Sequence, residues 1–242
     1  MQFYNDRLAY EHTPGNNGSV LFCGGFASNM YGTKATALAH FCQENDLAYT
    51  RFDYSGHGNS KGEFLECNIS IWLQDSIDIL CNITNGPQII IGSSMGGWLM
   101  LLLALRYPER INGLIGIAAA PDFTEDLYSI LSHEQKLQLQ NDNYTFMQSA
   151  ADGNTYLVTK GFLEDGKKNL LFSKPSIKIN APVILLHGMK DHVVPYQQSL
   201  KISEKLTSED VTIRLLKHAD HSMNDDKALE TLYSSIVSII HK

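Results

Sequence analysis

The sequence predicts an α/β fold, with a doubly wound, mostly parallel sheet, and three observations lead to this prediction. Six short runs rich in apolar and β-branched residues recur along the 242-residue chain. Most of these runs are continuous rather than alternating, which is typical of strands buried on both faces of a parallel sheet. Helical patterns separate the runs, and strand–helix alternation is the pattern of a doubly wound sheet.

Each predicted strand ends at a glycine, a polar loop or the start of a helical pattern. The run at 20–23 leads into Gly24-Gly25, and the run at 48–53 leads into a glycine-rich loop. The later predicted strands are 88–91, 114–117, 182–186 and 211–216. The segment 7–12 predicts an additional edge strand at the start of the sheet. In such a sheet, ligands bind at the carboxyl ends of the strands.

The predicted helices follow the strands and complete the alternation. They are 32–44, 71–82, 96–106, 197–206 and 225–240. The segment 122–176 breaks this rhythm, because its pattern is helical and polar and it is too long for an ordinary connection. We expect residues 1–121 and 177–242 to form the core and 122–176 to form a cap inserted over the sheet. The alternative is a helical excursion packed on the side of the sheet.

Composition limits the partners and the compartment. The formal net charge is −7, which disfavours a polyanionic partner such as nucleic acid. The N-terminus lacks the pattern of a secretory signal, and the apolar stretches 98–105 and 111–121 are too short and interrupted for a membrane span. A cytoplasmic protein is therefore expected. The sequence does not predict an oligomeric state.

The segment Gly92-Ser93-Ser94-Met95-Gly96 predicts a nucleophile. It follows a strand, precedes an apolar helix and fits the pattern G-x-S-x-G centred on Ser94. A serine at such a sharp turn has strained dihedrals, and larger side chains two positions away would collide. Ser93 is the competing candidate, but Ile91 and Met95 would then occupy the positions that require small residues.

A serine nucleophile needs a base that is oriented by a carboxylate. Asp191 lies in a tight loop just past the strand 182–186, where the acid is expected; Asp122, after an earlier strand, is the alternative. His221 precedes the final helix and is the predicted base. His218 competes for this role, but it is closer to the end of the last strand and is expected to shape the loop.

Other polar clusters are weaker candidates. His57, in the glycine-rich loop after the second predicted strand, is expected to shape that loop and to border the site. No cysteine pair has CxxC spacing, and no metal site and no cofactor are predicted. A metal alternative would draw on five side chains without a recognised helical spacing, namely His187, Asp191, His192, His218 and His221.

Acyl transfer also needs two donors aimed at the developing oxyanion. The backbone N–H of Met95, directly after the nucleophile, is one predicted donor. The backbone N–H of Phe26, in the loop after the first predicted strand, is the other, because Gly24 and Gly25 let the backbone approach closely. The alternative is that the two glycines only form a tight turn. Four apolar side chains are near the turn at Ser94, called the elbow below, and could face an acyl chain: Phe26, Met30, Met95 and Trp98. Of these, Met30 and Trp98 are expected to lie in the core instead.

Several motifs resemble those of a known family. The loop 51–60 resembles the D-x-x-G-x-G-x-S loop of α/β-hydrolases. Four stretches resemble the palmitoyl-protein thioesterases, also described as mycophenolic acid acyl-glucuronide esterases. They are 86–89, 92–100, 185–191 followed by 194–195, and 217–218 with 220–221 and 223. The resemblance implies an α/β-hydrolase fold and covers nearly the whole chain except the predicted cap. Because no mitochondrial presequence is visible, we expect a bacterial relative of this family.

Carried over residue by residue, the resemblance implies Ser94, Asp191 and His221 as catalytic residues, with Phe26 and Met95 as backbone donors. The sequence departs from the family at the oxyanion loop, which reads Gly-Phe-Ala-Ser at 25–28 rather than Gly-Tyr-Leu-Ser. The cap also diverges, so the family's activity carries over more safely than its substrate.

The functional prediction is a serine hydrolase that cleaves carboxylic esters or thioesters through an acyl-enzyme. The resemblance implies acylated proteins or acyl glucuronides as substrates, and small-molecule esters fit the same chemistry. Two alternatives remain open: an acyltransferase or peptidase with the same triad, and a non-catalytic binding protein on a hydrolase fold. Because all three predicted triad residues are present, the second alternative is disfavoured.

Overall fold

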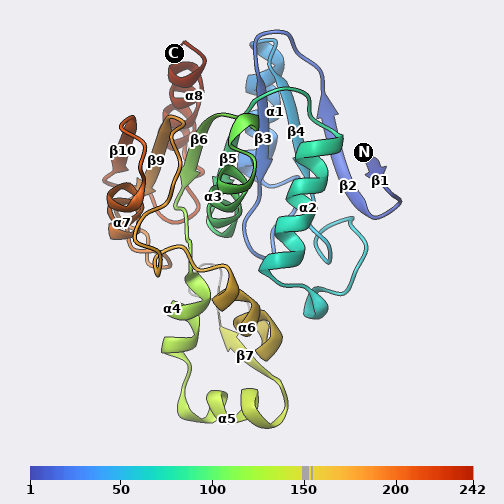
Figure 1. Cartoon of the computed structure of the whole chain (residues 1–242), viewed down its shortest axis with the longest axis vertical. Coiled ribbons are helices and arrows are strands. Elements are labelled where there is room, and N and C mark those ends of the chain that lie inside the picture. Colours follow the sequence, from blue (N-terminus) through green and yellow to red (C-terminus); the bar gives the residue numbers. More distant parts are fainter. Residues whose placement is uncertain (149–152, 154, 242) are drawn as a thin grey trace.

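Most strands of the protein belong to one sheet. The computed structural model describes residues 1–148, 153 and 155–241. In chain order, the strands of this sheet are β1 (Gln2–Tyr4), β2 (Leu8–Thr13), β3 (Ser19–Cys23), β4 (Ala48–Phe52), β5 (Gln88–Ser93), β6 (Ile111–Ile117), β9 (Val183–Gly188) and β10 (Val211–Leu216). Their spatial order is β1-β2-β4-β3-β5-β6-β9-β10 (Figure 1).

The pairing confirms a mostly parallel sheet. β1 pairs antiparallel with β2, and β2 pairs antiparallel with β4. All the other neighbouring strands, from β4 to β10, run parallel. All six predicted core strands are present, and the predicted edge strand is β2. The first strand, β1, was not predicted; it forms a hairpin with β2.

Helices cover both faces of the sheet, as a doubly wound fold requires. Helices α1 (Thr33–Glu44) and α8 (Asp226–Ile240) pack together on one face. Helices α2 (Ile69–Asn82), α3 (Met95–Arg106) and α7 (Gln197–Lys205) contribute to the core on the other face (Figure 1). The five predicted helices are therefore confirmed to within a few residues at their ends. Two short 3₁₀ turns, 64–66 and 108–110, complete the core.

The segment between β6 and β9 lies outside the main sheet. It contains α4 (Phe123–Ile130), α5 (His133–Asn141), β7 (Tyr144–Gln148), β8 (Thr155–Thr159) and α6 (Lys160–Lys168). β7 and β8 form a separate antiparallel pair. The helical pattern predicted for this segment is present as α4, α5 and α6, whereas the two five-residue strands β7 and β8 were not predicted. In Figure 1 it projects beyond one end of the sheet.

Asp122 joins the start of this segment to its end. Its two carboxylate oxygens accept hydrogen bonds from the amides of Leu171 and Phe172, each at 2.8 Å. A Cβ on Gly166 of α6 would lie 2.3 Å from the Thr124 hydroxyl, so α6 packs directly against the first turn of α4. Asp122 thus connects the two ends of the segment between β6 and β9, which is called the insertion from here on, where it meets the sheet.

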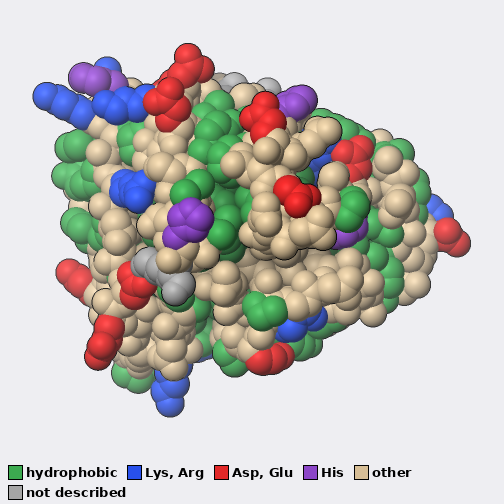
Figure 2. All heavy atoms as spheres, turned by 90° about the horizontal axis from the view of Figure 1, so that it is seen from above, with side chains coloured by type: hydrophobic (Ala, Val, Ile, Leu, Met, Phe, Trp, Pro, Cys, Tyr) green, Lys and Arg blue, Asp and Glu red, His purple; other side chains and the backbone are tan. Residues whose placement is uncertain are grey.

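The surface shows no concentration of one charge on the face seen in Figure 2, where acidic and basic side chains are interspersed. Such a face offers no continuous basic track for a phosphate backbone. Among the helices of residues 1–148 and 155–241, none combines the length and hydropathy needed to cross a membrane.

Candidate active site

Ser94 lies at the sharp turn between β5 and α3. Its dihedrals are φ +54° and ψ −118°, which a non-glycine residue adopts only when its surroundings enforce them. A Cβ on Gly92 would lie 2.4 Å from the Gly96 carbonyl oxygen, and one on Gly96 would lie 2.1 Å from that of Cys23. The prediction that both flanking positions require glycine is therefore confirmed by the backbone packing.

Three side chains from distant parts of the chain form one hydrogen-bonded line. The Ser94 Oγ lies 3.2 Å from the His221 Nε2, and the His221 Nδ1 lies 2.7 Å from the Asp191 Oδ2. Because the Asp191 carboxylate accepts, the Nδ1 donates its proton and the Nε2 is free to accept the serine proton. The three residues predicted as a triad are thus brought together by the fold.

The Asp191 carboxylate is enclosed, with no exposed side-chain surface. Burial alone would raise the pKa of this carboxyl, but hydrogen bonds from His187, His221 and Val194 outweigh burial and lower the pKa well below its usual range. Its Oδ1 accepts from the amides of Val193 and Val194, both at 2.8 Å. Asp191 is therefore an ionised acceptor across the physiological pH range.

His187, considered above only as a metal ligand, is a neighbour of the Asp191 carboxylate. It is fully buried, and its Nε2 lies 2.9 Å from the Val194 carbonyl oxygen and 3.2 Å from the Asp191 Oδ2. Its Nδ1 lies 2.8 Å from the Ser199 hydroxyl of α7. His187 thereby connects the Asp191 loop to α7. Its position at the end of a buried strand was the available signal.

The competing candidates lie elsewhere or have other contacts. Ser93 is the last residue of β5 and lines the same pocket, but the imidazole of His221 is bonded to Ser94. His218 is exposed. Asp122 binds the two amides at the base of the insertion instead of a histidine. In the described part of the chain, no three histidine, cysteine or acidic side chains are arranged to hold a metal ion.

The predicted oxyanion donors flank Ser94. Met95 is the first residue of α3, where the backbone N–H has no acceptor within the helix. On the other side, a Cβ on Gly25 would lie 3.6 Å from the Ser94 Cβ, so the loop that carries Phe26 passes directly over the serine. Both amides lie near the serine, and their role as donors stays a prediction.

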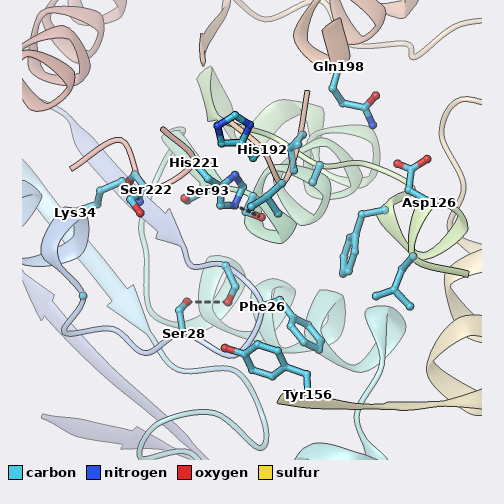
Figure 3. Close-up of a pocket in the computed structure, with 18 of the residues that line it drawn as sticks. Phe26, Ser28, Lys34, Ser93, Asp126, Tyr156, His192, Gln198, His221 and Ser222 are labelled. Atoms are coloured by element: carbon cyan, nitrogen blue, oxygen red, sulfur yellow. Dashed lines mark hydrogen bonds between the residues drawn. The ribbon is translucent and has the colours of Figure 1, made fainter. Parts of the chain in front are cut away.

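A pocket of about 640 Å³ borders Ser94 and His221. This volume is in the usual range for a small-molecule site. Much of its wall is apolar and comes from both the core and the insertion: Phe26, Phe123, Leu127, Ile130, Met147 and Val158. Figure 3 shows Lys34 and Ser222 on one side of His221 and Asp126 on the other. The pocket therefore has a polar, partly basic end and an apolar wall that the core and the insertion share.

The four apolar candidates near the elbow divide between pocket and core. Phe26 lines the pocket and packs edge-on against Phe123 and Tyr156 of the insertion. Met30 and Trp98 are buried in the core, as expected, and the side chain of Met95 is buried as well. The elbow is thus packed from below by core side chains and faces the pocket above.

Lys34, at the start of α1, is a pocket residue that the sequence did not reveal. Its ammonium donates to the Ser222 carbonyl oxygen, one residue past His221, and to the Asn224 side chain at 3.4 Å. Burial lowers the pKa of Lys34 to about 8, against the opposing influence of Asp220. A charge that titrates near neutral pH therefore contacts the loop that carries the predicted base.

The chain has clear relatives among known proteins. A family model described as "Serine aminopeptidase, S33" matches residues 15–157 and 163–228. The mitochondrial palmitoyl-protein thioesterase ABHD10 of Rattus norvegicus is 38% identical over 236 residues, which cover 97% of this chain and 79% of that protein.

Solved structures are similar over the same length. The α/β-hydrolase domain-containing protein 10 from mouse has a TM-score of 0.90 and 37% identity, covering 97% of this chain and 94% of that one. A putative hydrolase from Agrobacterium vitis has a TM-score of 0.91 and 32% identity, covering 96% and 93%. The chain therefore belongs to the α/β-hydrolase family, in the group of serine hydrolases that includes ABHD10, and it is an enzyme.

Proposed function

We propose that the protein hydrolyses long-chain acyl thioesters and esters through an acyl-enzyme formed on Ser94. The observation that supports this most strongly is the line of hydrogen bonds from Ser94 through His221 to Asp191, at 3.2 and 2.7 Å, beside a largely apolar pocket. The pocket can accept a hydrocarbon chain, and the Ser94 hydroxyl, with His221 as its base, lies at the border of that pocket.

In the proposed reaction, the Ser94 Oγ attacks the acyl carbon while the His221 Nε2 takes its proton. The amides of Met95 and Phe26 stabilise the oxyanion, and Asp191 stabilises the imidazolium. The tetrahedral intermediate collapses as His221 protonates the leaving thiol or alcohol. Water, deprotonated by His221, then attacks the acyl-enzyme and releases the carboxylic acid. No metal ion or cofactor enters these steps.

The acyl group is proposed to lie along the insertion and the leaving group toward Lys34. Leu127, Ile130 and Val158 supply apolar surface on the insertion side. Each buried methylene of an acyl chain gains about 0.8 kcal/mol there, so longer chains bind more tightly until the wall ends. The relatives named palmitoyl-protein thioesterases support a long acyl chain and a thioester.

The segment 122–176 is proposed to act as a cap. Its residues supply much of the apolar wall, and Asp122 fastens its two ends to each other at the base. Acyl preference should accordingly follow substitutions in α4 and β8 more than substitutions in the core. We also propose a cytoplasmic location, in contrast to the mitochondrial location in the names of the ABHD10 relatives; cell fractionation of the native host tests it.

The test is hydrolysis of a panel of nitrophenyl esters and acyl thioesters from short to long chain, with Ser94→Ala measured alongside. We expect kcat/KM to rise with chain length and Ser94→Ala to lose activity by at least about 10⁴-fold. Equal activity on all chain lengths would contradict the acyl-pocket assignment. Undiminished activity in the alanine variant would contradict the proposed function itself.

A peptidase is the second candidate, and the description of the matching family model favours it. The same triad would cleave an amide, with His221 protonating the leaving amine. Aminoacyl nitroanilides and short peptides, assayed beside the acyl thioesters, separate the two activities. Added alcohols as acyl acceptors reveal any acyltransferase activity in the same experiment.

A further inference from the structure

The loop that follows β4 carries a motif that the proposed reaction does not use. Gly56 and Gly58 of this loop both have positive φ, at +72° and +48°. A Cβ on Gly58 would lie 2.2 Å from the Asp53 carboxylate, and one on Gly56 would lie 2.7 Å from the Phe64 backbone. The glycines therefore fold the loop tightly around Asp53 and present His57, which lies between them, inward.

His57 is buried among aromatic rings and bonded at both nitrogens. Its exposed fraction is 4%, and its ring lies 5.1 Å from the rings of both Phe64 and Trp72. The Ala27 backbone N–H donates to the Nε2 at 3.1 Å, so this nitrogen carries no proton. The Nδ1 therefore carries the proton and donates to the Ser55 carbonyl oxygen at 3.2 Å. The two contacts define a single neutral tautomer.

The backbone that His57 holds is the predicted oxyanion loop. Ser28 donates to the Gly25 carbonyl oxygen from its amide at 3.3 Å and its hydroxyl at 2.7 Å, so Phe26 and Ala27 form the centre of a turn (Figure 3). Ala27 has φ +54°, a conformation that a non-glycine residue keeps only when its surroundings enforce it. The bond to His57 fixes the peptide that joins Ala27 to Phe26.

We propose that His57 is a positioning residue, which holds the Phe26 amide in the geometry needed to stabilise the oxyanion. This inference rests on the proposed function, because it concerns the same acyl transfer. Asp53 of the same loop supports it from the other side, since its Oδ1 accepts from the Met30 amide at 2.7 Å. Two side chains of one motif thus hold the backbone that directly follows the donor, at the amides of Ala27 and Met30.

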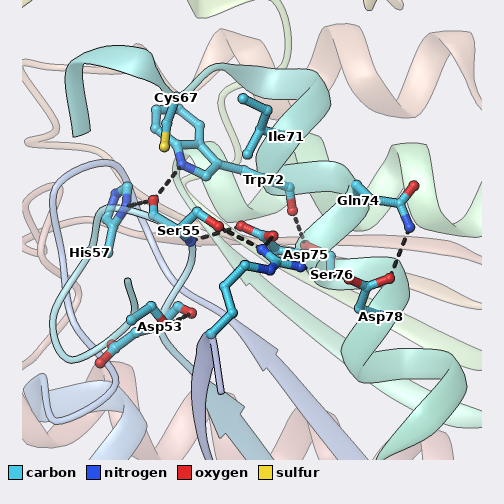
Figure 4. Close-up of polar contacts among 12 residues, drawn as sticks. Asp53, Ser55, His57, Cys67, Ile71, Trp72, Gln74, Asp75, Ser76 and Asp78 are labelled. Atoms are coloured by element: carbon cyan, nitrogen blue, oxygen red, sulfur yellow. Dashed lines mark hydrogen bonds and ion pairs between the residues drawn. The ribbon is translucent and has the colours of Figure 1, made fainter. Parts of the chain in front are cut away.

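Ser55, whose carbonyl oxygen accepts from the His57 Nδ1, is itself held by a network of hydrogen bonds (Figure 4). The Ser55 carbonyl oxygen also accepts from the Trp72 indole at 3.0 Å, and the Ser55 amide donates to the Asp75 Oδ2 at 2.7 Å. The buried Asp75 carboxylate is paired with the Arg7 guanidinium. Burial lowers the pKa of His57, against the Ser55 hydrogen bond and the charges of Asp53 and Asp75 that raise it, and so favours the neutral acceptor form.

The test compares two amides at position 57. The oxygen of His57→Gln can reach the position of the Nε2 and accept from Ala27, whereas His57→Asn reaches only the position of the Nδ1. Both variants lose the ring, so packing losses affect both. We expect His57→Asn to lower kcat by about 10- to 100-fold with KM nearly unchanged, and His57→Gln to stay within about threefold of the wild type. Amide hydrogen exchange at Ala27 should accelerate in the asparagine variant alone.

Two further measurements keep the outcome decisive. Long-range nitrogen–proton NMR of the wild-type imidazole should show the proton of His57 on Nδ1, without requiring any variant to fold. A proton on Nε2, or equal kcat values in the two amide variants, would overturn the inference. Ser94→Ala distinguishes failure of the His57 inference from failure of the proposed function. If Ser94→Ala loses activity while His57→Asn and His57→Gln have equal kcat values, the role of His57 is wrong and the proposed function still holds.

Discussion

Replacing Asp191 by asparagine changes one atom and should reverse the tautomer of His221. The Asp191 Oδ1 accepts from two backbone amides at 2.8 Å, so the single oxygen of the asparagine must take that position. Its NH₂ group then faces the His221 Nδ1, where the aspartate Oδ2 accepted at 2.7 Å. The Nδ1 must become an acceptor, which moves the ring proton to the Nε2. That nitrogen can no longer take the proton of Ser94.

The expected loss in kcat is about 10⁴-fold, or about 5 kcal/mol of transition-state stabilisation. Stopped-flow hydrolysis of a long-chain nitrophenyl ester measures it at pH 7, with thermal unfolding as a check on folding. Asp122→Asn is the matched control, because that carboxylate also accepts from two amides but contacts no histidine. We expect the control to lower the melting temperature and leave kcat within about tenfold. A loss below tenfold in the Asp191 variant would refute the reasoning.

Two further predictions concern the elbow and the polar end of the pocket. Gly96→Ala should lower the free energy of unfolding by about 3 kcal/mol, because its Cβ would overlap the Cys23 carbonyl oxygen at 2.1 Å. Gly161→Ala, where the new Cβ enters open space on α6, should raise the free energy of unfolding by about 0.5 kcal/mol. Urea unfolding of both variants measures these changes, and equal effects would contradict the packing argument. Since burial lowers the pKa of Lys34 to about 8, the ammonium that binds Ser222 loses its charge above that pH, and kcat/KM should fall there. Lys34→Arg should abolish this alkaline decline in a pH–rate profile from 6 to 10, and an unchanged decline would assign it to another group.

The features that the sequence predicted well are those set by short-range constraints. Strands buried on both faces need continuous apolar runs, so β3, β5 and β9 were visible without knowledge of their neighbours. The candidate nucleophile was visible for a similar reason. The turn at Ser94 leaves room only for glycine two positions away on each side, and this spacing can be read from five residues.

The features that the sequence missed depend on contacts between distant residues. β7 alternates in burial, but its aromatic residues Tyr144 and Phe146 lie on the exposed side and Thr145 is buried, so its hydrophobicity does not follow its burial. β8 has no clear period of two. Lys34 meets Ser222 across 188 positions, and no local pattern marks that contact. His57 was expected to shape its loop and to border the site, but its contact with Ala27 was not predicted, because that hydrogen bond joins two separate loops at the ends of β3 and β4.

The central claim is that Ser94 carries the acyl group during turnover. Rapid acid quenching of the enzyme with a long-chain nitrophenyl ester, followed by digestion and mass spectrometry, measures this directly. We predict one acylated peptide, which contains Ser94, disappears in Ser94→Ala and accumulates before the steady state. An acyl group on any other residue, or its persistence in the alanine variant, would contradict the account.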